Sequence, residues 1–255
     1  MLRRNVLVGL AALGLVTALA TPAMAASQRL RWRFDSASAV VTTVVDDSSH
    51  GHVGTVATSN GGQITTVTPG RDGIGQAVKF PAMCTTAPCP EAMITSPGST
   101  ATDLDPGTAV FSYGVWTKVS LSELSDTAGS NLFQKGLWNT SQWKVQIDPP
   151  HTGYPKGAPS CVVVEPGGVN AKVAYSTVTV ADGNWHKITC QRTSTEIQIY
   201  VDTTKTGFKD LGSSAYVVNP AGQQVTLGAK SVGSNNDQYH GIMDDVFYND
   251  YLAYP

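Results

Sequence analysis

The acidic side chains are the first candidates for chemistry, because two carboxylates on one strand can act as acid and nucleophile or base in glycoside hydrolysis. The four glutamates are instead isolated in the sequence, as Glu91, Glu123, Glu165 and Glu196. No strand-like run presents two of them on one face. The G-x-S-x-G nucleophile motif and the H-E-x-x-H metal motif are also missing. These patterns favour a protein without a catalytic centre.

The first 25 residues have the pattern of a secretory signal. Arg3 and Arg4 form a basic start, Val6 to Ala20 is an uncharged apolar run, and Ala23-Met24-Ala25 offers small residues for cleavage. The apolar run is shorter than the roughly 20 residues that a membrane-spanning helix needs. We therefore expect cleavage after Ala25 and a secreted, extracellular product comprising residues 26–255.

The charge pattern excludes two classes of partner. The formal net charge is −2, and lysines and arginines occur singly rather than in clusters. Binding to nucleic acid or to an anionic membrane requires clustered basic side chains. No stretch after the signal is long and apolar enough to span a bilayer. We expect no nucleic-acid partner and no membrane span.

The four cysteines, Cys84, Cys89, Cys161 and Cys190, predict two disulfides, because an even number in an exported chain is typical of a disulfide framework. Paired cysteines at clear zinc-ligand spacing are not found. Three pairings are possible. We expect Cys84–Cys89 to close a short loop and Cys161–Cys190 to connect neighbouring strands.

Short runs rich in β-branched and aromatic residues recur between turn signals over the whole mature chain. The strongest run spans residues 109–119 and is apolar on both faces, which predicts a central strand. Residues 188–192 and 196–202 predict a hairpin in which Ile197, Ile199 and Val201 share one face. No helical periodicity of useful length occurs. The sequence therefore predicts one all-β domain, a sandwich or a barrel.

Several motifs then resemble one family. They are Asp182-Gly183-Asn184-Trp185-His186-Lys187-Ile188-Thr189 with its partner Ile197-Gln198-Ile199-Tyr200-Val201-Asp202, the turn from Asp47 to Gly54, the run from Gly73 to Phe80, and the closing strand from Tyr239 to Tyr248. In their order and spacing they resemble the laminin-G-like jelly-roll, or concanavalin-A-like lectin/glucanase, superfamily. The resemblance covers about Leu30 to Tyr254 and implies a two-sheet antiparallel β-sandwich.

The resemblance also implies a structural calcium ion, which many members hold where the first and last strands meet. Calcium is bound by six to eight oxygens from carboxylates, carbonyls and water. Asp47 and Asp244 are the first candidates for ligands, and Asp35 and Asp245 are weaker ones. The alternative interpretation is that Asp47 only caps a turn and that Asp244 and Asp245 lie in a solvated edge strand.

Aromatic side chains are candidate platforms for a sugar ring, unless they belong to the core. Five are considered: Trp138, Trp143, Tyr154, Tyr175 and Tyr239. Trp138 and Tyr154 lie in polar or Gly/Pro-rich surroundings and are the best exposed candidates. Trp116 and Trp185 lie within apolar strands, so we expect both in the core.

The leading hypothesis for function is a secreted, non-catalytic, lectin-like module that binds a glycan or cell-surface polysaccharide. An extracellular protein-binding or adhesion domain is the alternative, since the sequence does not separate the two. A glycoside hydrolase or polysaccharide lyase of the same fold is a weaker alternative, because neither the paired carboxylates of the former nor a lyase signature is found. Fold alone does not decide among these.

Overall fold

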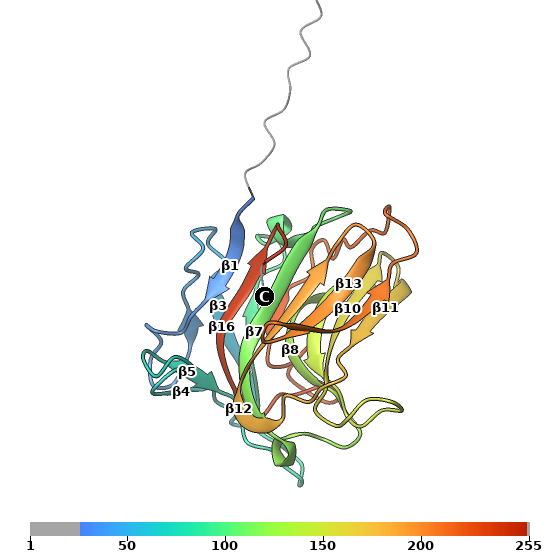
Figure 1. Ribbon diagram of the computed structural model, residues 1–255. Helices are drawn as coiled ribbons and strands as arrows, with labels where there is room; N and C mark the ends of the chain where they lie inside the picture. Colours follow the sequence, from blue (N-terminus) through green and yellow to red (C-terminus); the bar gives the residue numbers. More distant parts are fainter. Residues whose placement is uncertain (1–25, 254–255) are drawn as a thin grey trace, which may run out of the picture.

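The computed structural model describes residues 26–253, in which two antiparallel β-sheets lie face to face (Figure 1). This architecture confirms the predicted all-β sandwich and the jelly-roll expectation. The predicted signal, residues 1–25, lies outside the described residues. Within residues 26–253, no helix has the length and apolar character needed to cross a membrane.

The first sheet, called sheet A, has the strand order β14-β13-β12-β7-β16-β5-β4, and β1 also pairs with β16. These strands alternate inward apolar and outward polar residues, as expected for a sheet with one face on a core. Their bounds are β1 (Gln28–Trp32), β4 (Thr65–Val67), β5 (Ala77–Lys79), β7 (Phe111–Ser120), β12 (Asp182–Arg192), β13 (Glu196–Val201), β14 (Thr204–Asp210) and β16 (Ile242–Asn249).

The second sheet, called sheet B, has the order β11-β10-β9-β8-β15-β6-β3-β2. The described chain also contains two short 3₁₀ turns, η1 (Thr102–Leu104) and η2 (Leu121–Glu123). The bounds of the strands are β2 (Thr43–Val44), β3 (Gly54–Ser59), β6 (Glu91–Ser96), β8 (Ser130–Leu137), β9 (Ser141–Ile147), β10 (Pro159–Glu165), β11 (Val169–Tyr175) and β15 (Val225–Leu227).

Strand β7 is central, as predicted, because it pairs with β12 on one side and β16 on the other. Its inward residues Tyr113 and Val115 are fully buried, and the Tyr113 ring lies 5.0 Å from that of Trp143 on β9. Period-two alternation places Trp116 on the opposite, outer face, where it is half-buried. Trp185 is also half-buried and lies opposite Lys118 of β7. The expectation that Trp116 and Trp185 belong to the core is therefore wrong.

The predicted hairpin is confirmed as β12 paired with β13, and Ile197 and Ile199 are fully buried. β13 lies between β12 and β14, and β14 is the last strand at this edge of sheet A. Consequently the chain from Thr204 to Asp210 forms the free edge of this sheet. That edge matters below, because it contributes one wall of a groove.

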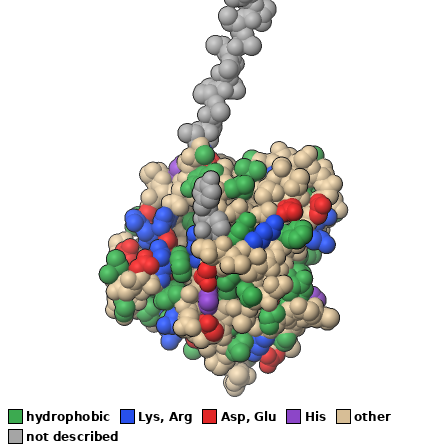
Figure 2. Space-filling model, viewed as in Figure 1, with side chains coloured by type: hydrophobic (Ala, Val, Ile, Leu, Met, Phe, Trp, Pro, Cys, Tyr) green, Lys and Arg blue, Asp and Glu red, His purple; other side chains and the backbone are tan. Residues whose placement is uncertain are grey.

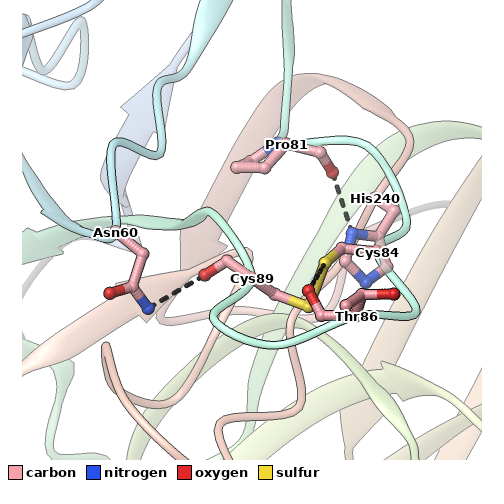
Figure 3. Close-up of a disulfide and its surroundings, with 6 residues drawn as sticks. All are labelled: Asn60, Pro81, Cys84, Thr86, Cys89 and His240. Atoms are coloured by element: carbon pink, nitrogen blue, oxygen red, sulfur yellow. Dashed lines mark hydrogen bonds between the residues drawn. A yellow bond between two sulfur atoms is a disulfide. The ribbon is translucent and has the colours of Figure 1, made fainter.

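Both predicted disulfides are present. Cys84–Cys89 closes a loop, where Asn60 donates a hydrogen bond to the Cys89 carbonyl and His240 contacts Pro81 (Figure 3). Cys161 lies on β10 and Cys190 on β12, so this bond joins sheet B to sheet A across the core. The pairing is confirmed, but the expectation of neighbouring strands is wrong, because the two strands belong to opposite layers.

Candidate functional site

A groove lies where edge strand β11 of sheet B meets edge strand β14 of sheet A. Its volume is about 550 Å³. We call it the aromatic groove, and it is lined by Tyr154, Tyr175, Thr177, Lys205, Thr206, Gly207 and Phe208. It combines flat apolar rings with hydroxyl groups and one ammonium, which is the composition of a site for a polar ligand with an apolar face.

One wall of the aromatic groove is formed by the rings of Tyr154 and Tyr175, and the His151 ring packs against both of them from outside the lining. Tyr154 lies 4.8 Å from Tyr175 between ring centroids, and His151 lies 5.8 Å from Tyr154 and 5.2 Å from Tyr175. The turn of residues 151–154 sets this arrangement, since the Tyr154 N–H donates to the His151 carbonyl at 2.8 Å. Gly153 makes the turn at φ +85°, a conformation that costs a residue with a Cβ.

The other wall is formed by β14, which approaches the end of β11 closely. A Cβ on Gly207 would lie only 2.0 Å from the Tyr175 carbonyl oxygen, so only glycine fits here. Thr177 follows β11 and donates from both its N–H and its hydroxyl to the Thr206 carbonyl, each at 3.2 Å. The contact between the two sheet edges therefore holds Tyr175 beside β14.

The aromatic groove contains an exposed apolar ring next to charged and hydroxyl side chains. Phe208 is 59% exposed, and the Lys205 ammonium lies 4.7 Å from its ring centroid while pairing with Glu196 at 3.0 Å. Burial raises the pKa of Tyr175, and the nearby Asp148 carboxylate adds to the shift. The Tyr175 hydroxyl therefore stays protonated at neutral pH and can donate a hydrogen bond.

The structure separates the predicted aromatic platforms. Tyr154 and Tyr175 meet in the aromatic groove. Trp138 is 55% exposed at the β8–β9 turn, and it does not line this groove. Trp143 is fully buried, so the core interpretation of this candidate is the correct one and it is not available as a platform.

Tyr239 is also excluded as a platform, and the predicted ligand role for it is wrong. The side chain is fully buried, and its ring packs edge-on at 5.6 Å from Phe80. Its hydroxyl contacts that of Thr117 at 2.6 Å and donates to the Ile242 carbonyl. The sequence predicts that Tyr239 begins the closing strand, but β16 starts only at Ile242 and the Tyr239 side chain is buried, so its aromatic face is not available to a ligand.

Phe208 and Lys205 were not singled out in the sequence, although they complete the groove. One signal exists: Phe208 is the only aromatic residue in an otherwise polar strand, Thr204–Asp210. An isolated aromatic among polar strand residues has little core to join. Its neighbour across the groove is contributed by another sheet, however, and that proximity has no local sequence signal.

The four predicted calcium ligands do not form one group. Asp35 and Asp244 lie on either side of the loop from Gly70 to Gly75: Asp35 accepts from the Gln76 N–H at 3.1 Å and Asp244 from the Arg71 N–H at 3.0 Å. Both line a cavity of about 200 Å³. Burial raises the pKa of Asp244 to about 6, the Asp245 carboxylate adds to the shift, and the Arg71 charge opposes it. Arg31, Arg33 and Arg71 line the same cavity.

Asp245 and Asp47 are engaged elsewhere. Asp245 lines the same cavity but pairs with Arg31 at 2.7 Å and Arg71 at 2.9 Å, while exposed Asp47 pairs with Arg33 at 3.1 Å. Across residues 26–253, no three His, Cys, Asp or Glu side chains are grouped so as to hold a metal ion. Two carboxylates, Asp35 and Asp244, fit a calcium ion here only if backbone carbonyls and water supply the remaining oxygens.

Comparison of the sequence with protein families adds the decisive observation. The profile of the concanavalin A-like lectin/glucanases superfamily matches residues 94–252, more than half of the chain. The chain belongs to this superfamily. Among curated proteins, no relative of this concanavalin A-like chain is found.

Solved structures share the fold of this concanavalin A-like chain at low sequence identity. Domain 4 of AbnA, a GH43 extracellular arabinanase from Geobacillus stearothermophilus solved with arabinotriose, has a TM-score of 0.61 and 14% identity, covering 88% of this chain and 92% of that domain. The binding domain of botulinum neurotoxin DC with rat synaptotagmin II has a TM-score of 0.61 and 10% identity. That match covers 89% of this chain but 49% of the toxin domain. These likenesses concern the fold.

The same superfamily includes glucanases, so the positions of the glutamates matter. In the concanavalin A-like chain, Glu91 lies on β6, Glu165 on β10 and Glu196 on β13, while Glu123 lies in η2. None of these three strands neighbours another, and β13 is in the opposite sheet. No strand among the described residues therefore presents two glutamates on one face, the pattern sought in the sequence.

Proposed function

We propose that the protein is a secreted, non-catalytic module that binds a glycan through the aromatic groove. The observation that carries this is the ring cluster of Tyr154 and Tyr175 facing exposed Phe208. A pyranose or furanose ring has apolar C–H faces and a rim of hydroxyls. The rings offer flat surfaces for the former, and Thr177, Lys205 and the Tyr175 hydroxyl offer partners for the latter.

Neighbouring structures support this choice of ligand class. The AbnA domain was solved with arabinotriose, and a related neurotoxin binding domain with SialylT, at TM-scores of 0.61 and 0.58. Another was described in terms of two ganglioside molecules. One neurotoxin domain binds a protein, synaptotagmin, so a protein ligand remains an outcome of the experiment below.

Replacing Tyr175 by alanine is expected to weaken glycan binding by about thirtyfold, because truncating a central aromatic anchor typically costs ~2 kcal/mol. The measurement is retention of residues 26–255 on a panel of insoluble polysaccharides and cell walls, including arabinan, followed by titration with soluble fragments of the glycan retained. Tyr154→Ala should have a similar effect, and circular dichroism checks that both variants fold.

Trp138→Ala is the discriminating variant, because Trp138 is aromatic and more exposed than the half-buried Tyr154 and Tyr175 but lies outside the groove. If Trp138→Ala abolishes retention while Tyr175→Ala does not, the site is at the β8–β9 turn and the groove assignment is wrong. If the wild-type chain is retained on no glycan, the glycan proposal is contradicted and an extracellular protein becomes the favoured ligand.

We also propose a structural calcium ion between Asp35 and Asp244, with the loop from Gly70 to Gly75 supplying carbonyl oxygens. The support is the shared cavity and the raised pKa of Asp244, whose ionised form a cation would stabilise. When bound, the ion would fix the loop between β4 and β5 against β16. It has no part in the ring contacts of the aromatic groove.

Calcium at about a hundred times its dissociation constant should raise the melting temperature by roughly 5–10 °C relative to EDTA, because such saturation adds ~2.7 kcal/mol and a domain of this size gains about 2–4 °C per kcal/mol. Differential scanning calorimetry measures this. Asp244→Asn should remove the calcium effect and Asp47→Asn should retain it. An unchanged melting temperature in the wild type would contradict the calcium proposal.

A further inference from the structure

A second pocket, on the outer face of sheet A, is not explained by the aromatic groove. Its volume is about 240 Å³, enough for one monosaccharide unit. We call it the basic pocket, and its principal lining residues are Arg31, Arg71, Trp116, Lys187, Asp245 and Phe247. They come from β1, the β4–β5 loop, β7, β12 and β16. Figure 2 shows basic and acidic side chains gathered on the side of this face where β1, β16 and β5 lie.

The apolar floor of the basic pocket depends on a glycine in the central strand. Gly114 pairs with Phe247 across the β7–β16 ladder, and a Cβ at Gly114 would lie 2.9 Å from the Phe247 ring. The missing side chain leaves the Phe247 ring room to lie over β7. Trp116, two residues further on, projects from the same face. Two aromatic rings thus line a pocket on a sheet face that is otherwise polar.

Two of the three cations in the basic pocket are already paired. The Arg31 guanidinium donates from Nε at 2.7 Å and from Nη2 to Asp245. Arg71 also donates to Asp245, at 2.9 Å, as well as to Asp72 at 2.7 Å, and its guanidinium carbon lies 4.6 Å from the Trp116 ring centroid. One carboxylate, Asp245, therefore serves two guanidinium groups within the pocket.

Lys187 is the third cation, and no carboxylate or hydrogen-bond acceptor in residues 26–253 contacts its ammonium. The nearest described contact is the Phe247 ring, with its centroid 5.6 Å away. Burial lowers the pKa of Lys187, the Asp245 carboxylate opposes that shift, and the Arg71 and Arg31 charges add to it. The pocket therefore has three cations for one lining carboxylate, and its half-buried ammonium has an unused hydrogen-bonding capacity.

We propose that the basic pocket binds the carboxylate of an acidic sugar, a uronate unit of a polysaccharide, with the Lys187 ammonium as its ion partner. An anion there relieves the repulsion between Lys187 and the two guanidinium groups. The Trp116 and Phe247 rings provide an apolar surface for the sugar ring. The amide side chains of Gln28 and Asn249 also line the pocket and can bond its hydroxyls.

The test uses residues 26–255 and titration calorimetry with polygalacturonate, alginate and hyaluronan in EDTA, which excludes calcium bridging. The hyaluronan titration is repeated with calcium, because the proposed calcium ion would hold the loop that carries Arg71. Methyl-esterified polygalacturonate is the matched neutral probe, since it keeps the sugar and removes the charge, and dextran sulfate is the sulfate probe. We expect binding to at least one uronate polymer, weakened by added salt. For polygalacturonate, esterification should abolish it.

Lys187→Met should weaken that binding about tenfold, because it removes a charge-assisted contact while keeping the length and apolar stem of the side chain. Its ammonium has no described partner, so the substitution leaves no acceptor unsatisfied. Lys79 is exposed on β5 and lies outside the pocket. Lys79→Met changes the net charge by the same amount and should leave the affinity unchanged.

Three outcomes would overturn the proposal: no binding to any uronate polymer, equal binding of the methyl ester, or equal effects of Lys187→Met and Lys79→Met. Binding to dextran sulfate alone would reject the carboxylate as the ligand. The aromatic groove is tested by Tyr175→Ala on a different ligand panel, so failure of either site leaves the other assignment standing.

Discussion

Replacing Cys161 and Cys190 together by alanine is expected to lower the free energy of unfolding by about 3–4 kcal/mol. The two residues are 29 apart in the sequence, and in the chain-entropy account the stabilisation grows with the length of the closed loop. Both sulfurs are fully buried and join β10 of sheet B to β12 of sheet A. The bond therefore restrains the two layers directly.

Chemical unfolding of the wild type and the Cys161→Ala/Cys190→Ala variant under non-reducing conditions measures this difference. The Cys84→Ala/Cys89→Ala variant is the control. Its loop spans only 5 residues at the surface, so the expected loss is smaller, about 2 kcal/mol. Equal losses for the two variants would contradict the view that the bond between the layers dominates.

Asp105→Ala is expected to destabilise the fold by about 3–5 kcal/mol, because it leaves a buried ammonium without its counter-ion. Lys135 on β8 is completely buried, and its ammonium pairs with Asp105 and donates to the Ala101 carbonyl at 2.8 Å. Burial lowers the pKa of Lys135 and raises that of Asp105, because desolvation disfavours both charged forms, and the charge of each partner opposes this effect. The loss in Asp105→Ala should shrink as the pH rises and Lys135 becomes neutral.

The double variant Asp105→Ala/Lys135→Met should recover most of this loss, since replacing both members of a buried ion pair by apolar groups is often neutral. Chemical unfolding at pH 7 and pH 9 compares the two variants. A loss below about 1 kcal/mol for Asp105→Ala is typical of an exposed ion pair. Such a result would mean that solvent reaches this site.

Local patterns were sufficient for much of the fold. Alternation in the run 196–202 predicted that Ile197, Ile199 and Val201 share one face, and all three are buried. The expected pairing of the four cysteines is confirmed. The alternation is a local property of the strand. The even number of cysteines predicts two disulfides but leaves three pairings open, and only the short loop between Cys84 and Cys89 is a local signal for a pairing.

The sequence did not decide which face of β7 is inward, and Trp116 shows why. Residues 109–119 are apolar on both faces, and a shift of one residue in an alternating strand exchanges the two faces. Only the packing of sheet A on sheet B, where Tyr113 contacts Trp143 of β9, places Tyr113 inward and Trp116 outward. The basic pocket follows from that choice.

The aromatic groove was decided entirely by tertiary structure. Tyr175 ends β11 and Phe208 lies on β14, and these strands are the free edges of opposite sheets. The sequence identified Tyr154 and Tyr175 as aromatic candidates, but it did not show that closing the sandwich brings β14 beside them. The sequence by itself determined the strands and the presence of two disulfides, because these depend on local alternation and residue type, whereas the layers that Cys161–Cys190 joins were decided by the tertiary structure. The sites depend on which strand edges meet, and that is set by packing between layers distant in the chain.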